Sequence, residues 1–124
     1  MGYDTSKASN SIRHGGPEHR YWVDKIAERM EKDGYKVRKE YPIGGGKTID
    51  VLAVKDGKKT AVEVETGKSD VMSNIRKAVE EGMDYVIVAV TKKAVMKKIE
   101  EQVANGNFPA DSGVRVVEVN ELLR

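Results

Sequence analysis

The chain has 124 residues, of which 22 are Lys or Arg, 20 are Asp or Glu and none is Cys. This length predicts a single domain that buries a core without covalent staples. The absence of cysteine excludes disulfides, thiol catalysis and thiolate metal sites. A net charge of +2 excludes a uniformly basic surface, so any nucleic-acid contact must be local. Because no apolar run is long enough to cross a bilayer and no signal-peptide pattern is present, we expect a soluble, cytoplasmic protein.

The N-terminal third begins with a polar segment and continues with an amphipathic helix. Residues 1–16 show no periodicity, and we expect a flexible arm that precedes one domain over residues 17–124. Pro17 suits a first helical position, and a helix over residues 17–33 is predicted by apolar residues at helical spacing, namely Trp22, Val23, Ile26, Ala27 and Met30. Glu18 falls at the rim of this stripe, where its carboxylate either complements the helix dipole or reaches a site beside the core.

A predicted strand over residues 35–41 leads into a glycine-rich loop. The letters Gly-Gly-Gly-Lys-Thr at residues 44–48 invite comparison with a phosphate-binding loop. That motif needs a glycine where Tyr41 stands and a helix after the Lys-Thr pair, whereas a strand follows here. We therefore expect no nucleotide cofactor, although Lys47 can still contact a phosphate from this loop.

Residues 48–65 form the most informative stretch, because apolar residues alternate on both sides of Asp56-Gly57. Asp-Gly between two alternating runs is a strong signal for a β-hairpin, since a two-residue turn needs positive φ at both positions. With these two residues as the loop, Val51 pairs with Val62 and Asp50 faces Glu63. Directly opposite carboxylates have Cβ atoms about 4.5–5.5 Å apart, and like charges in that position are destabilising.

Glu65 lies on the same strand face as Glu63, so three acids are predicted to share one edge of the hairpin. A divalent cation such as Mg²⁺ would neutralise them. The alternative is a half-exposed strand whose acids lie in water. Against it, Ile49 is expected to share an apolar face with Val51, Val62 and Val64, while Leu52, Val54 and Ala61 make the other face apolar as well. This pattern favours a strand that is covered on both sides.

The rest of the chain alternates helices and strands. Ser69 can cap a helix that runs to about residue 82, with Arg76 and Lys77 off its apolar stripe. Residues 85–90 are continuously apolar, which is typical of a parallel strand buried on both faces. Thr91 can cap a helix that runs to about residue 104. A strand over residues 114–119 and at most one helical turn over 121–124 complete the order. The predicted class is α/β with a central mixed sheet.

With Asp50 and Glu63-Val64-Glu65 on consecutive strands, a helix before them and a helix and buried strand after them, the chain resembles the PD-(D/E)XK nuclease superfamily. The resemblance covers about residues 18–90. It implies a restriction-endonuclease-like α-β-β-β-α-β core and a metal-dependent endonuclease that hydrolyses DNA. Ile49 stands where the motif has proline, and Glu65 stands where it usually has lysine. Some restriction endonucleases carry a similar Glu-x-Glu and remain active.

The resemblance also implies roles for individual residues. Asp50, Glu63 and the Val64 carbonyl would bind Mg²⁺, for which Mn²⁺ can substitute, and Glu18 matches a helix acid found in the branch that includes archaeal Holliday-junction resolvases. Glu65 could act as general base on the attacking water. The charge of the missing lysine would come from one of three basic residues, Lys68, Arg76 or Lys77.

Two further expectations concern partners. DNA is the expected substrate, contacted by Lys47, Lys68, Arg76 and Lys77, and a homodimer is the common way to cut two strands. The second hypothesis is a nuclease-like fold retained as a DNA-binding or assembly module without catalysis, because the motif lysine is absent. A third is a structural α/β domain with solvated acids.

Overall fold

The computed structural model describes residues 16–106, 108 and 113–124, so the arm expected over residues 1–16 lies outside the described residues except for Gly16. The elements follow the predicted order: α2 (Pro17–Lys32), β1 (Lys36–Gly44), β2 (Lys47–Lys55), β3 (Lys58–Glu65), α3 (Val71–Glu80), β4 (Tyr85–Val90), α4 (Lys93–Ala104), β5 (Val114–Glu118) and α5 (Val119–Leu122). None of the helices formed by these residues is long and apolar enough to span a membrane.

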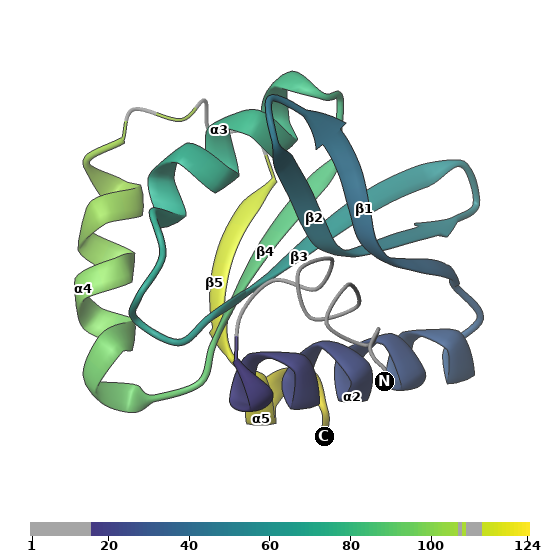
Figure 1. Ribbon diagram of the computed structural model, residues 1–124, viewed down its shortest axis with the longest axis horizontal. Helices are drawn as coiled ribbons and strands as arrows, with labels where there is room; N and C mark the ends of the chain where they lie inside the picture. Colours follow the sequence, from purple (N-terminus) through teal and green to yellow (C-terminus); the bar gives the residue numbers. More distant parts are fainter. Residues whose placement is uncertain (1–15, 107, 109–112) are drawn as a thin grey trace, which may run out of the picture.

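All five strands belong to one sheet in the order β1-β2-β3-β4-β5. The β1–β2 and β2–β3 pairs are antiparallel, and the β3–β4 and β4–β5 pairs are parallel. Helices α2 and α5 lie on one side of the sheet, and α3 and α4 lie on the other (Figure 1). The predicted fold class is confirmed: this is an α/β domain with an α-β-β-β-α-β core around a central mixed sheet.

The hairpin between β2 and β3 has the predicted turn and register. Asp56 and Gly57 have φ angles of 53° and 79°, as a two-residue turn requires. The ladder runs from Lys55 opposite Lys58 to Val51 opposite Val62. The two turn residues, Asp56 and Gly57, therefore set the pairing of ten strand residues.

Two apolar clusters fill the spaces on either side of the sheet. Ile75 of α3 and Ile99 of α4 pack with Leu52 and Ala61 on one side, whereas Val23 and Ile26 of α2 pack on the other side with a group of strand residues that includes Val51, Ala53, Val62 and Val64. Ile49 belongs to the first cluster, so the prediction that it shares a face with Val51 is wrong. The simple alternation fails between these two residues, at Asp50. Opposite that position in β1, Glu40 has a left-handed φ of 54°.

Two helices begin later than predicted because the expected cap residues are used elsewhere. Asp70, and not Ser69, caps α3 by accepting a hydrogen bond from the Ser73 N–H (3.2 Å). The Ser69 hydroxyl donates instead to the Glu65 carboxylate (2.5 Å). Thr91, expected to cap α4, donates its hydroxyl to the Glu65 backbone carbonyl (3.4 Å). Both hydroxyl groups therefore donate hydrogen bonds to Glu65, the last residue of β3.

Candidate active site at the divergence of β2 and β3

Asp50 and Glu63 lie where strands β2 and β3 part. The ladder between them ends at Val51 opposite Val62, whereas the pairing of β3 with β4 continues through Glu63 to Glu65. The Val64 N–H donates to Asp50 Oδ2 (2.8 Å), so the Asp50 side chain occupies the place where a ladder bond would continue. Asp50 and Glu63 are only 7% and 5% exposed. The structure thus brings together the two acids that the hairpin register predicted to be neighbours.

His19 is a site residue that the sequence reasoning missed. Its Nε2 lies 3.1 Å from Asp50 Oδ2, and both side chains are largely buried. A helical projection could have found it, because at 100° per residue His19 aligns with the buried Val23, Ile26 and Met30 of α2. Glu18, which the sequence singled out, falls off this line, and His19 is the residue that faces the sheet.

Burial is the main reason why the pKa of Glu63 is raised well above its ordinary value of 4.5. The negative charge of Asp50 raises it further, with smaller contributions from Glu40 and Glu65, and a hydrogen bond from the Asp50 backbone partly offsets the rise. Glu40, which also was not predicted, comes from β1. A carboxyl group in this environment favours a neutralising proton or cation.

This elevated pKa of Glu63 fixes the direction of a pH effect on folding. Below pH 4.5 the group is protonated in both the folded and the unfolded chain and costs nothing. As pH rises from there to the folded-state pKa, the unfolded chain releases its proton first, so the free energy of unfolding falls. Above the folded-state pKa this loss is complete.

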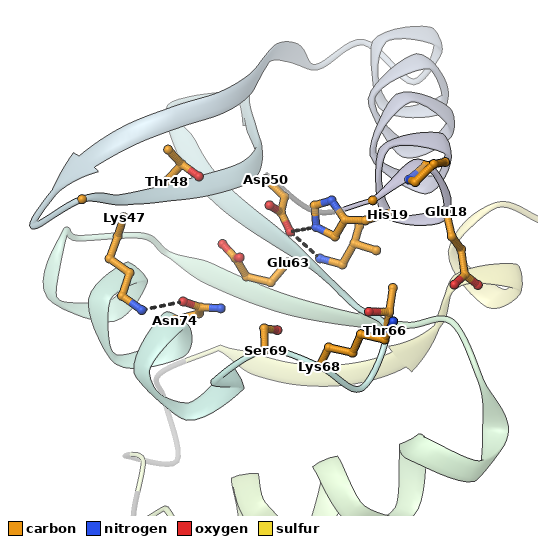
Figure 2. Close-up of a pocket in the computed structure, with 14 residues that line it drawn as sticks. Glu18, His19, Lys47, Thr48, Asp50, Glu63, Thr66, Lys68, Ser69 and Asn74 are labelled. Atoms are coloured by element: carbon orange, nitrogen blue, oxygen red, sulfur yellow. Dashed lines mark hydrogen bonds and ion pairs between the residues drawn. The ribbon is translucent and has the colours of Figure 1, made fainter. Parts of the chain in front are cut away.

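The pair of acids borders a cavity of about 560 Å³. Its walls come from the start of α2, the start of β2, the end of β3 and the segment that leads into α3, and Figure 2 shows the labelled side chains around it. Ten of its fourteen lining residues have polar or charged side chains; the full set is Gly16, Pro17, Glu18, His19, Gly46, Lys47, Thr48, Asp50, Glu63, Val64, Thr66, Lys68, Ser69 and Asn74.

The four basic residues predicted to contact nucleic acid separate into two pairs. Lys47 and Lys68 line the cavity, and the Lys47 ammonium donates to Asn74 Oδ1 (3.3 Å). Arg76 and Lys77 are not among the lining residues. The Arg76 guanidinium lies over the Phe108 ring, 5.9 Å from its centroid. Lys77 extends toward Gly45 in the β1–β2 turn.

Glu65 does not line the cavity, in contrast to Glu63 two residues earlier. Its side chain is 2% exposed and turns toward residues 67–69. Its Oε2 accepts a hydrogen bond from the Gly67 N–H (2.7 Å), and its Oε1 accepts one from the Ser69 hydroxyl (2.5 Å). This orientation does not support the predicted contact of Glu65 with an attacking water.

The predicted metal ligands are only partly assembled. Glu18 lines the cavity, but its exposed carboxylate points away from Asp50 and Glu63 (Figure 2). Within residues 16–106, 108 and 113–124, no three His, Asp or Glu side chains gather as a group that could hold an ion by themselves. The pair of Asp50 and Glu63 nevertheless fits Mg²⁺, which keeps several waters and is commonly bound through one or two carboxylates and substrate phosphates.

Comparisons with known proteins address the fold. No family model and no curated protein matches the sequence. A solved structure of a protein of unknown function, AF1548, is similar to this chain with a TM-score of 0.52 and 16% identity, over 82% of this chain and 64% of that one. A repair endonuclease from Pyrococcus abyssi gives a TM-score of 0.49 and 18% identity, over 86% of this chain and 47% of that one. The chain thus spans less than two thirds of either protein, and at these identities the likeness concerns the fold alone.

Proposed function

We propose that this domain is a metal-dependent endonuclease of the PD-(D/E)XK type that hydrolyses DNA phosphodiester bonds. The observation that carries the proposal is the pair of adjacent, buried carboxylates, Asp50 and Glu63, at the divergence of two strands and beside a cavity that is also lined by two lysines. The raised pKa of Glu63 supports the proposal, because it shows that two negative charges at this site are unfavourable, and a bound cation would neutralise them.

Asp50 and Glu63 would hold Mg²⁺ or Mn²⁺, with the Val64 carbonyl as a further ligand. When bound, such an ion makes a water nucleophilic near neutral pH and stabilises charge on a phosphate. His19 contacts Asp50 Oδ2 and thereby orients this carboxylate. Lys47 and Lys68 supply positive charge on the cavity wall, where the sugar-phosphate backbone of DNA would bind.

The second candidate is a DNA-binding or assembly module of the same fold that does not catalyse. One observation favours it: at the motif position where a lysine is usual, Glu65 stands and its carboxylate is directed away from the cavity. The two candidates share a fold and differ in metal binding. Calorimetry with Mg²⁺ and Mn²⁺, in the presence and absence of DNA, separates them.

The test of the endonuclease is cleavage of branched, linear and single-stranded DNA with each metal, for the wild type and for Asp50→Asn. We expect the variant to lose at least about a hundredfold in rate, since even residues that only support a metal ligand cost 10–100-fold. Its fold should survive, because an asparagine oxygen can still accept from the Val64 N–H. The matched control is Asp56→Asn in the hairpin turn, where asparagine tolerates the positive φ. Equal cleavage by wild type and Asp50→Asn would refute the assignment.

A further inference from the structure

The segment between β3 and α3, residues 66–70, forms one wall of the cavity and is hydrogen-bonded to a side chain that does not line the cavity. Thr66, Lys68 and Ser69 line the cavity, whereas the Glu65 carboxylate lies behind them and accepts hydrogen bonds from the same segment. A third, longer contact joins the Ser69 N–H to Glu65 Oε2 (3.5 Å). Hydrogen bonds to an ionised acceptor are about twice as strong as neutral ones. This carboxylate therefore restrains residues 67 and 69 directly.

The backbone of residue 65 is itself held by hydrogen bonds from Thr91, so the Glu65 side chain starts from a fixed position. The Glu65 carbonyl accepts from the Thr91 N–H (3.1 Å) and from the Thr91 hydroxyl. On the far side of the segment, Gly67 has a φ of +102°, and a Cβ there would lie 3.1 Å from Val95 Cγ2. The segment is thus confined between the end of β3 and α4, and its conformation demands glycine at residue 67.

Lys68 is the residue that this confinement presents to the cavity. Within the part of the chain that the structure describes, it makes no hydrogen bond or ion pair, and its backbone lies between the two residues that contact Glu65. The other lining lysine, Lys47, has its ammonium hydrogen-bonded to Asn74. An ammonium on a cavity wall that pairs with none of the described residues suits a phosphate oxygen, which lysine binds as a point charge.

We infer that Glu65 is a positioning residue, which holds residues 67–69 so that the Lys68 ammonium contacts the phosphate of a bound DNA strand. The inference rests on the proposed function for the identity of that substrate. The inference assigns Glu65 a role different from that of a general base. Glu65 fixes the backbone of residues 67–69, and Lys68 supplies the positive charge. Removing the restraint leaves Lys68 in the chain but spreads its ammonium over many positions, which weakens its contact with phosphate.

Glu65→Gln separates positioning from base catalysis. The glutamine oxygen can accept from the Gly67 N–H while its amide donates to the Ser69 hydroxyl oxygen, so the segment keeps its conformation, yet an amide cannot take a proton from water. We expect Glu65→Gln to retain cleavage within about threefold of wild type, and Glu65→Ala to lose about tenfold, the equivalent of one charge-assisted contact. Loss of cleavage by Glu65→Gln to the level of Glu65→Ala would overturn the inference.

Coupling to Lys68 provides the second readout. Lys68→Ala should lower cleavage about tenfold, Lys68→Arg should restore most of it, and the double variant of Glu65→Ala with Lys68→Ala should be no worse than either single variant. Additive losses of about a hundredfold would show that Glu65 acts independently of Lys68 and would overturn the inference. Lys97→Ala, on the exposed surface of α4, is the matched control. If Glu65→Ala folds poorly, Ser69→Ala removes one of the two short contacts and should give the same coupling with a smaller loss.

Hydrogen exchange tests the restraint without any cleavage. In Glu65→Ala the Gly67 amide should exchange at least about tenfold faster than in wild type, whereas the amides of β4 should be unchanged. Unchanged exchange at Gly67 would overturn the inference. If wild type cleaves no DNA with either metal, the proposed function fails. Then fluorescence anisotropy with labelled DNA decides the role of Lys68: weaker binding by both Lys68→Ala and Glu65→Ala supports the inference, and unchanged binding overturns it.

Discussion

Replacing Glu65 with lysine would introduce the residue that is usual at this position of the motif that the chain resembles, yet the structure predicts a loss of stability. In wild type the Glu65 side chain accepts hydrogen bonds, and its partners are the Gly67 N–H, the Ser69 N–H and the Ser69 hydroxyl. A lysine ammonium only donates, so in Glu65→Lys the Gly67 and Ser69 N–H groups lose their acceptor, and only the Ser69 hydroxyl oxygen can still pair with residue 65, which is 2% exposed. The substitution is conservative with respect to the motif and disruptive with respect to this fold.

The size of the effect follows from the two backbone N–H groups, of Gly67 and Ser69, that lose their acceptor. A hydrogen bond to a charged group contributes about 1.5 kcal/mol or more, so the loss of two costs about 3 kcal/mol in the free energy of unfolding. Burial of the ammonium adds to this cost, and its attraction to the nearby Glu63 carboxylate offsets part of it. Against a typical stability of about 5–15 kcal/mol, a net loss near 3 kcal/mol leaves a folded but weakened protein, with a melting temperature lower by roughly 10 °C.

Urea denaturation followed by circular dichroism measures this loss, and cleavage assays run on the same samples below the melting temperature. The control is Glu80→Lys at the exposed end of α3, which makes the same change of charge and should alter stability by less than about 0.5 kcal/mol. A Glu65→Lys protein as stable as wild type that cleaves DNA faster would refute the reasoning. That result would mean that residue 65 reaches the cavity and that the motif works here in its usual form.

Two other predictions concern neighbouring residues. Because burial raises the Glu63 pKa, the free energy of unfolding of wild type should fall as pH rises above 4.5. Glu63→Gln should remove this slope and be the more stable protein at neutral pH without metal. Urea titrations across a pH series measure the stability of both proteins, and parallel pH profiles would contradict the prediction. Gly67→Ala should cost about 1–3 kcal/mol, because its φ is +102° and its Cβ would press on Val95. Gly16→Ala, at an ordinary φ with open space around it, is the control, and equal stability of the two variants would show that the segment relaxes freely.

The sequence was sufficient for the features that depend on local chemistry. Asp56-Gly57 fixed the turn, the turn fixed the register, and the register brought Asp50 and Glu63 together, because each step depends on residues adjacent along the chain or paired across two strands. The order of helices and strands followed in the same way from apolar periodicity. Even His19 was within reach of a helical projection, since it aligns with Val23 on the buried side of α2.

Tertiary structure decided where the ends of the elements point. Alternation placed Glu65 beside Glu63, but β3 ends at residue 65 and the donors of the following segment draw its carboxylate away from the cavity. The start of α3 at Val71 leaves Lys68 on the cavity wall, while Arg76 and Lys77 lie two turns or less along the helix and contact other elements.

Both outcomes have one physical reason. Periodicity reports which side of an element is apolar, and it carries no information on which donors a loop will offer to a buried carboxylate or how far a helix start is displaced along the chain. The sequence by itself therefore determined that two acids meet at the junction of β2 and β3. Only the packing of β3 against the segment before α3 decided that Glu65 faces that segment and that Lys68 faces the cavity.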